Sequence, residues 1–204
     1  DIDIFSVIED FKILSDVEYA EPNYILKTCL IPNDPLFSNQ WSLNQANDHD
    51  IDAPEAWDIE VGNSDTIVGI IDTGIDYNHP DLAGNIWINI NEIADNGIDD
   101  DNNGFVDDYL GWDFAYDDND PIDDDGHGTH CAGVVGAVTN NNMGIAGINW
   151  NCKLMSLKGI NECGCGYVSD LANAIYYATD NGADVISMSW GGYSSSDALK
   201  NAIN

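Results

Sequence analysis

Apolar and polar residues follow one another along the chain in blocks that predict strands and helices in turn. The continuous, largely β-branched apolar run at 67–71 is typical of a buried parallel strand, and residues 153–158 and 185–189 are predicted to form two further strands. Between them, the small apolar residues of 128–138 and the helical spacing of 169–181 predict two helices. Strands that alternate with helices indicate an α/β protein with a doubly wound, mainly parallel sheet.

Cap and turn residues predict where these elements end. Ser169 is expected to cap the second helix, and Gly182 stands just past its end. Upstream of the first strand, residues 33–57 are expected to form an arm that ends in a short helix near Pro54. Residues 1–27 differ from the rest, because short apolar pieces there are broken by acids and proline.

Composition adds a strong charge asymmetry. The chain has 204 residues, 44% of them hydrophobic, so we expect one domain, or part of one, with a sizeable core. Five lysines and no arginine stand against 37 acids, which gives a net charge of −32. Such a surface repels nucleic acid and anionic membranes. No apolar run approaches the ~20 residues that span a bilayer.

Many of the acids gather between residues 95 and 125, in loops rich in Asn and Gly. Several oxygen donors on flexible turns are what Ca²⁺ prefers, so these loops are candidate cation sites. The alternative is a solubilising or salt-adapted face, which we favour for acids outside the loops.

Two motifs carry candidate catalytic chemistry. Asp72 follows the first apolar run and precedes a Thr-Gly turn, so it stands at the carboxyl end of a strand, where active residues of such sheets lie. His127 lies in Asp-Gly-His-Gly-Thr-His, at an expected helix start. A carboxylate can orient an imidazole that takes the proton of a nucleophile. The order Asp then His requires a serine that comes last, and the chain ends at Asn204 before any Gly-Thr-Ser turn.

Two other chemistries use similar motifs. Asp-Thr-Gly also occurs in aspartic peptidases, where two carboxylates share a proton, but no second Asp-Thr-Gly or Asp-Ser-Gly occurs here. His127 and His130 are three residues apart, as metal ligands can be, but no zincin glutamate lies between them. The acid and the imidazole together therefore favour a serine-dependent hydrolase.

The five cysteines are an odd number, which leaves at least one thiol unpaired. Cys131 follows the His motif among small residues, where a packed free thiol is favoured over a disulfide. Cys163 and Cys165 are expected to be too close to pair comfortably with each other. Each then reaches another cysteine or remains an exposed thiol.

These motifs, together with Val-Ile-Ser-Met-Ser-Trp-Gly-Gly at 185–192, closely resemble those of the subtilisin-like serine peptidases, or subtilases, of the thermitase-like kind. The resemblance extends from about Asn33 to the end of the chain. It implies a sheet of the subtilisin type, truncated before the nucleophile helix. It also implies that Asp72 orients His127, the general base, and that His130 packs in the core.

The same resemblance implies how the chain is organised. Residues 1–27, with Val-Glu-Tyr-Ala-Glu-Pro-Asn at 17–23 as an expected strand, resemble the tail of an inhibitory propeptide. Residues 28–204 resemble the N-terminal part of the catalytic domain. The alternative for the first stretch is an ordinary N-terminal strand and linker.

The resemblance also implies two substrate-binding segments on opposite sides of a cleft. Peptide main chain would pair with them as an added strand, and side pockets would select residues. Trp190 occupies a position that often holds Leu, so it is expected to reshape the main specificity pocket. The implied residues are Gly164, Cys165 and Gly166 on one side and Ser189, Trp190 and Gly191 on the other.

Three calcium sites are implied or suggested, against the alternative of polar or acidic turns. In the first, by resemblance, oxygen ligands join the arm to a loop after the histidine helix: Asp34, Asp81, the side chain of Asn141 and the carbonyls of Thr139, Met143 and Ile145. The second has Asp99, Asp101 and Asn103 at EF-like positions, although Leu110 at the twelfth position argues against a true EF-hand. The third, by resemblance, comprises Asp113, Asp118 and Asp120.

The favoured function is a secreted, calcium-stabilised serine endopeptidase that hydrolyses protein or peptide substrates and binds its own propeptide. This segment, without the serine, is expected to be inactive by itself. The alternative is a catalytically dead subtilase-like module for peptide binding or calcium-dependent adhesion. Asp72 and His127 together favour the enzyme, because a binding module has no need of both.

Overall fold

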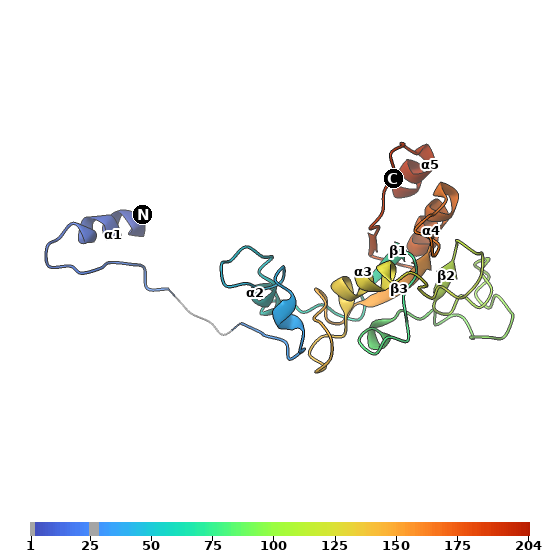
Figure 1. Cartoon of the computed structure of the whole chain (residues 1–204), viewed down its shortest axis with the longest axis horizontal. Coiled ribbons are helices and arrows are strands. Elements are labelled where there is room, and N and C mark those ends of the chain that lie inside the picture. Colours follow the sequence, from blue (N-terminus) through green and yellow to red (C-terminus); the bar gives the residue numbers. More distant parts are fainter. Residues whose placement is uncertain (1–2, 25–28) are drawn as a thin grey trace.

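A four-stranded parallel sheet lies at the centre of the computed structural model, which describes residues 3–24 and 29–204 (Figure 1). The elements run in the order α1 (Ile4–Lys12), η1 (Phe37–Asn39), α2 (Ala53–Trp57), β1 (Ile67–Asp72), η2 (Ala83–Asn85), β2 (Gly111–Asp113), α3 (His127–Gly136), β3 (Lys153–Lys158), α4 (Val168–Asp180), β4 (Val185–Ser187) and α5 (Asp197–Ile203). The predicted α/β class with a parallel sheet is confirmed.

The sheet has the strand order β2-β3-β1-β4, and every neighbouring pair is parallel. β1 is therefore an inner strand: it pairs with β3 along its whole length, with Asp72 opposite Lys158, and with β4 on the other side. Five of its six residues are buried, as an apolar run covered on both faces requires.

The two faces of the sheet are covered by different helices. Val68 and Ile70 of β1 pack with Leu154 of β3 and Ala132 of α3 in one cluster. Ile71 belongs to the other cluster, which contains the apolar face of α4. Alternate residues of each strand point to opposite faces, so α3 and α4 form the outer layers of a three-layer domain.

The structure differs from the prediction at two element ends. α4 begins at Val168 after the cap residue Tyr167, and the Ser169 hydroxyl bonds the neighbouring Asp170 carboxylate instead of capping, so the predicted cap is wrong. β4 ends at Ser187, not at residue 189. Beyond this end, the Trp190 indole N–H donates to the Ile71 carbonyl (2.8 Å). A side chain therefore takes the place of the next main-chain hydrogen bond between β1 and β4.

The arm packs through a third apolar cluster, separate from those of the sheet. The helix predicted near Pro54 is α2, and its Trp57 packs edge-on against Trp150. Gln40 fastens the arm to the domain, because its side-chain amide donates to the Ala146 carbonyl and accepts from the Ala146 N–H, both at 2.8 Å.

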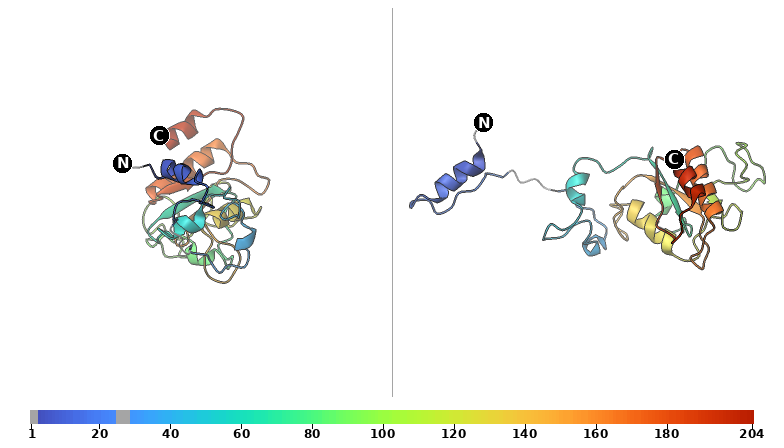
Figure 2. Two further views of the ribbon diagram at one scale, coloured as in Figure 1. Left: turned by 90° about the vertical axis from the view of Figure 1, so that its left-hand side faces the viewer. Right: turned by 90° about the horizontal axis from the view of Figure 1, so that it is seen from above.

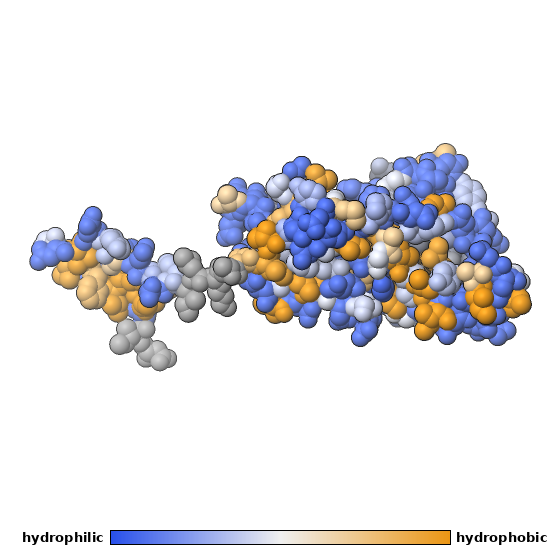
Figure 3. Space-filling model, turned by 90° about the horizontal axis from the view of Figure 1, so that it is seen from below, coloured by the Kyte–Doolittle hydropathy of each residue, from blue (hydrophilic) through white to orange (hydrophobic). Residues whose placement is uncertain are grey.

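The N-terminal segment contains a helix that the sequence pattern did not predict. α1 is capped by Asp3 and lies apart from the sheet (Figures 1 and 2), and the strand expected at 17–23 is absent, since those residues form no regular element. Apolar side chains gather on one side of this segment (Figure 3); Phe5 and Ile13 are 63% and 81% exposed. The predicted boundary at residues 27–28 falls outside the described residues.

Across residues 3–24 and 29–204, none of the helices combines the length and apolar character needed to cross a lipid bilayer.

Candidate active site

Asp72 and His127 are in direct contact, although 55 residues separate them. The Asp72 carboxylate lies at the end of β1 and is 1% exposed, and its Oδ1 lies 2.7 Å from His127 Nδ1. An ionised carboxylate only accepts hydrogen bonds, so Nδ1 carries the proton. Nε2 is then the basic nitrogen of the neutral ring, and the imidazole is half exposed. This geometry suits a base that takes a proton from an approaching group.

The turn after β1 holds the start of α3 against the sheet. The Gly128 N–H donates to Thr73 Oγ1 (2.9 Å). A Cβ on Gly128 would collide with the Gly74 carbonyl oxygen and crowd the Asp72 side chain. The absence of a side chain at Gly128 therefore allows the helix to approach closely enough for His127 to reach Asp72.

Asp123 organises the loop before α3, and sequence analysis missed it. Its Oδ1 accepts from the Thr73 hydroxyl (2.8 Å) and from the Gly126 N–H (2.9 Å). Its Oδ2 accepts from the N–H and hydroxyl of Thr129 (2.8 and 2.5 Å). Burial raises the pKa of Asp123, but the hydrogen bonds from Thr129, Gly126 and Asp125 outweigh it and hold the pKa below its ordinary value. The acid-rich turn before His127 was the available signal.

Carboxylates around the imidazole favour its protonated form. The hydrogen bond and charge of Asp72 raise the pKa of His127, desolvation opposes them, and the charges of Asp125 and Asp123 add to the rise. The pKa of the His127 imidazole is therefore above its ordinary value near 6.5. The Cys131 thiol lies 3.9 Å from Nδ1, and burial raises its pKa, so it stays a thiol beside the ring.

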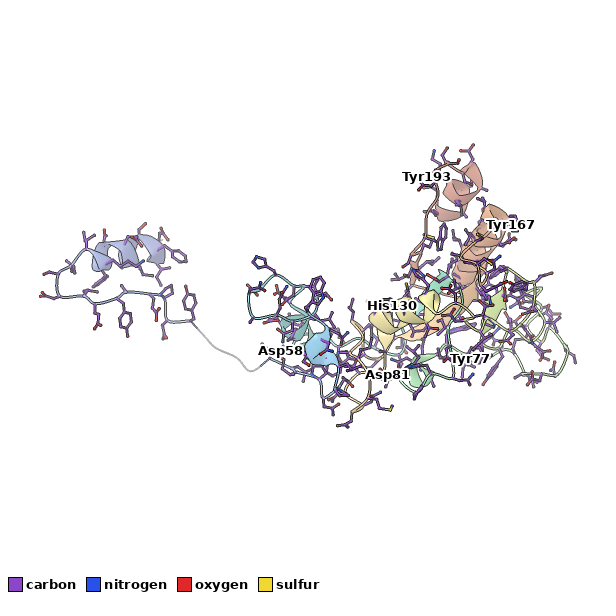
Figure 4. The ribbon with its side chains drawn as sticks, in the orientation of Figure 1. Asp58, Tyr77, Asp81, His130, Tyr167 and Tyr193 are labelled. Carbon is purple, nitrogen blue, oxygen red and sulfur yellow. The ribbon has the colours of Figure 1, made fainter. Side chains whose placement is uncertain are left out.

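The two predicted substrate segments leave the sheet on either side of β1. Gly164, Cys165 and Gly166 are exposed in the loop after β3. Ser189, Trp190 and Gly191 follow β4, with Trp190 half-buried and held by its indole bond to Ile71. Because β3 and β4 flank β1, both segments lie at the same sheet edge as Asp72. Tyr167, directly after Gly166, projects beside α4 (Figure 4).

The first predicted calcium site brings the arm and the 139–145 loop together. Asp34 and Asp81 are each 4% exposed. Asp34 accepts from the backbone N–H groups of Asn140 and Asn141 (2.8 and 3.1 Å). Asp81 accepts from the Ile145 N–H (3.0 Å) and from Asn141 Nδ2 (2.8 Å). Neither carboxylate has a cationic side chain within ion-pair distance among the described residues.

The remaining donors of this site suit a hard cation with one adjustment. The carbonyl oxygens of Thr139, Met143 and Ile145 accept no hydrogen bond from the part of the chain that the structure describes. The Asn141 amide presents its nitrogen to Asp81, so it must turn over to offer its oxygen to a shared cation. His130, expected in the core, is instead exposed, and it lines one cavity with Asp81 (Figure 4).

The second predicted site gains a residue that sequence analysis missed. Ligand oxygens of Asp99, Asp101 and Glu92 all lie within 4.8 Å of one another. Glu92 is 5% exposed; its Oε1 accepts from the Asp100 and Asp101 N–H groups (2.7 and 3.2 Å), whereas its buried Oε2 has no partner among the described residues. Asn103 Oδ1 instead accepts from the Phe105 N–H (2.8 Å). Glu92 lies outside the EF-like spacing, so only its acidic character was visible beforehand.

In the third predicted set, Asp113 and Asp118 pair through their main chains (2.9 and 3.1 Å), and the Asp120 N–H donates to Asp118 Oδ1 (3.0 Å). Asp113, Asp118 and Asp120 form no group of three with ligand atoms within 4.8 Å in the described ranges. Asp113 lies 3.7 Å from the buried Lys158 ammonium, and Asp120 accepts from the Tyr77 hydroxyl (2.7 Å). These contacts stabilise the acids individually, without a shared cation.

Comparison with known proteins places this site in context. The sequence model of the subtilase family matches residues 63–204. Thermitase of Thermoactinomyces vulgaris is 40% identical over 173 residues, which are 85% of this chain and 52% of that protein. A thermophilic serine proteinase of Bacillus sp. (strain AK1) is 37% identical over 188 residues, 92% of this chain and 40% of that protein.

Two further proteases are also similar to this chain. The halolysin-like extracellular serine protease Nep of Natrialba magadii is 38% identical over 179 residues, 86% of this chain and 29% of that protein. A solved protease structure from Pseudoalteromonas arctica superposes with a TM-score of 0.63 at 34% identity, over 84% of this chain and 54% of that one. The chain thus spans about half the length, or less, of these relatives.

Proposed function

This chain belongs to the subtilase family, and on that premise we propose that it contributes Asp72 and His127 to the catalytic triad of a secreted serine endopeptidase. The observation that carries the proposal is the 2.7 Å contact between the buried carboxylate and Nδ1 of a half-exposed imidazole. The nucleophilic serine belongs outside these residues, because no Gly-Thr-Ser turn occurs among them.

The two side chains have separate tasks in this mechanism. His127 Nε2 takes the hydroxyl proton as serine attacks the peptide carbonyl, and later returns it to the leaving amine. Asp72 holds the ring with Nε2 as the base and stabilises the imidazolium that forms. Asp123 and Gly128 act as positioning residues, because they fix the start of α3 against the turn after β1.

We propose that protein and peptide substrates bind between the segments 164–166 and 189–191. Both segments lie at the sheet edge that carries Asp72, which supports pairing of an extended peptide across the site. Trp190 is anchored to Ile71, so its ring would form a fixed wall of the specificity pocket.

We propose structural Ca²⁺ at two places. In the first, Asp34, Asp81, Asn141 and the free carbonyls of the 139–145 loop would hold the ion and join the arm to the domain. In the second, Glu92, Asp99 and Asp101 would share it, which gives the unpartnered Glu92 oxygen a ligand. Bound Ca²⁺ would neutralise carboxylates that no lysine of residues 3–24 and 29–204 reaches.

Residues 1–27 are proposed as the tail of an inhibitory propeptide, with residues 28–204 as the N-terminal part of the catalytic domain. The exposed apolar side of α1 supports this organisation, since such a surface is normally covered by another surface. The extracellular relative supports secretion.

The test is covalent labelling of the full-length protein with a fluorophosphonate, which reacts only with an activated serine. We expect labelling of the wild type, its loss in His127→Ala, and unchanged labelling in His49→Ala, where an exposed histidine is removed. A wild type that is not labelled contradicts the peptidase proposal and favours the inactive peptide-binding module. Pepstatin-sensitive hydrolysis without labelling indicates an aspartic peptidase instead.

A further inference from the structure

The loop after β3 contains a closed turn that carries two exposed thiols. Asn161 closes the turn: its N–H donates to the Cys165 carbonyl (2.9 Å), and its carbonyl accepts from the Gly164 N–H (2.9 Å). Its side-chain Oδ1 accepts from the N–H groups of Cys163 and Cys165, both at 3.1 Å. Gly164 supplies the left-handed φ of +71° that the turn needs.

The geometry of this turn bears on the expectation that the two cysteines, which are both exposed thiols in the structure, are too close to pair comfortably. In an extended strand, Cα atoms two residues apart are about 6.6 Å apart, near the upper limit of about 6.8 Å for a disulfide. A closed turn shortens that separation. The Cys165 sulfur already folds back over the turn, at 3.7 Å from the Cys163 carbonyl oxygen.

The other three cysteines lie outside this turn, and each is at least partly buried. Cys152 is fully buried beneath α3, and burial raises its pKa to about 11. Cys131 lies beside His127, and Cys29, which precedes the arm, lies 3.7 Å from the Glu55 carboxylate. Of the five cysteines, Cys163 and Cys165 are the two that are classed as exposed, and they share one turn.

We propose that Cys163 and Cys165 form a disulfide within this turn. A low-molecular-weight disulfide such as oxidised glutathione supplies the oxidant: one cysteine thiolate attacks it, releasing one glutathione thiol and forming a mixed disulfide. The second cysteine thiolate then displaces the other glutathione as a thiolate. One S–S bond is lost, one is formed, and the two cysteine protons end on the two glutathione thiols or in solvent.

The disulfide has a consequence for peptide binding, and this part rests on the proposed function. Both main-chain polar groups of Cys165 are used inside the turn. The N–H and carbonyl of Gly166 have no partner in the described residues, and Gly166 packs so tightly against the Gly159 carbonyl that a Cβ there would collide with it. Locking the turn fixes these free groups in place for a substrate strand, which lowers the ordering cost of binding.

Formation of the disulfide is tested on the full-length protein. The protein is equilibrated with oxidised glutathione, alkylated under denaturing conditions and digested with trypsin. Cleavage after Lys158 and Lys200 releases residues 159–200, whose only cysteines are Cys163 and Cys165. We expect this peptide unalkylated and lighter than the dithiol by two hydrogen atoms. A doubly alkylated peptide, or one joined to another cysteine peptide, overturns the proposal. This readout needs no activity, so it stands even if the peptidase proposal fails.

The functional part is tested by the KM of a long peptide that reaches Gly166 and of a short amide that does not. Reduction should raise the KM of the long peptide several-fold and leave that of the short one unchanged. The double variant Cys163→Ser/Cys165→Ser should show the higher KM under both redox conditions, which separates this disulfide from any other in the full chain. Equal KM values for oxidised and reduced wild type overturn the effect on peptide binding.

Discussion

Burial differs sharply between the two side chains of the proposed catalytic pair. Asp72 is 1% exposed, whereas His127 is half exposed. A buried, immobile carboxylate can hold an imidazole in one tautomer and orientation, and an exposed ring can meet substrate. The division of tasks between the two residues therefore follows from where β1 ends and where α3 begins.

Asp72→Asn should abolish most of the activity without unfolding the protein. The amide nitrogen can donate to Nδ1, which favours the ring tautomer with the proton on Nε2, and that nitrogen can no longer act as base. We expect kcat of the full-length enzyme to fall by about 10³- to 10⁴-fold. Asp180→Asn removes an equal charge from the exposed surface of α4 and should leave kcat unchanged. A loss below tenfold in Asp72→Asn contradicts the assigned role.

Asp125→Asn should extend activity to lower pH. The hydrogen bond and charge of Asp72, and then the charge of Asp125, raise the pKa of His127. The base must be neutral, so activity is lost as pH falls through that raised pKa. Removing the Asp125 charge lowers the pKa of His127 while the side chain keeps its acceptor oxygen for the His127 N–H (3.2 Å).

The acidic limb of kcat/KM against pH measures this shift. High salt screens surface charge and should move the wild-type limb in the same direction. An Asp125→Asn limb that stays in place or moves to higher pH rules out the electrostatic explanation.

Among the single residues of the site, those that belong to compact sequence motifs could be predicted from the sequence. Asp72 and His127 each stand at a recognisable element boundary, and their contact followed from the motif order. Asp123 and Glu92 act through partners that only the folded chain brings near, such as Thr73 for Asp123. Asp113 was assigned to a cation site by resemblance, and its acid-rich surroundings in sequence contain no hint of Lys158, 45 residues later and on a neighbouring strand.

Among the elements, the contact between α3 and the turn after β1 controls the site. Gly128 lies against the Gly74 carbonyl, with the Thr73 hydroxyl bonded to its N–H. The geometry of the catalytic pair depends on this one close approach of backbone to backbone.

Gly128→Ala should destabilise the protein although alanine favours helices. The propensity gain is at most about 1 kcal/mol. A methyl group forced against a backbone carbonyl costs about 1–3 kcal/mol, since neither backbone segment can move aside freely. We expect a lower denaturant midpoint and a lower kcat, because α3 must shift away from Asp72.

The matched control is Gly192→Ala, since a Cβ at Gly192 meets nothing within 4 Å. It should change stability by less than about 0.5 kcal/mol. A Gly128→Ala protein as stable and active as the wild type refutes the close-approach argument.

The inner strands and the two main helices could be predicted from the spacing of their apolar residues. The cap of α4 could not be predicted from the residue types at its start. The strand predicted at 153–158 matches β3 residue for residue. β4 is shorter than the strand predicted at 185–189 because the Trp190 indole takes over the Ile71 carbonyl. α1 was missed because Ile4, Phe5 and Phe11 read as short apolar pieces, without a buried partner face to set their spacing.

For the molecule as a whole, self-repulsion is the main electrostatic problem. A net charge of −32 on 204 residues favours expansion, and the acids at the two proposed calcium sites have no lysine within ion-pair distance among the described residues. Divalent cations bound at buried carboxylates offset part of that repulsion and join segments distant in sequence.

Removing calcium should lower the melting temperature of the full-length protein. An ion at about 100 times its Kd contributes about 2.7 kcal/mol, which corresponds to about 5–10 °C for 150–250 residues and to less for the longer full-length protein. The chelator-induced difference should shrink in Asp81→Asn and in Glu92→Gln, measured calorimetrically at constant ionic strength. Asp180→Asn, which removes the same charge elsewhere, should keep the full difference. Identical melting with and without chelator contradicts both sites.

The position of β1 inside the sheet also determines the order in which the site comes apart. Its main chain is hydrogen-bonded to strands on both sides, so its amide protons should be among the slowest to exchange with deuterium. The first turn of α3 depends on a loop and a few side-chain bonds. A local fluctuation should therefore release the imidazole first, while the acid remains held until the whole domain unfolds.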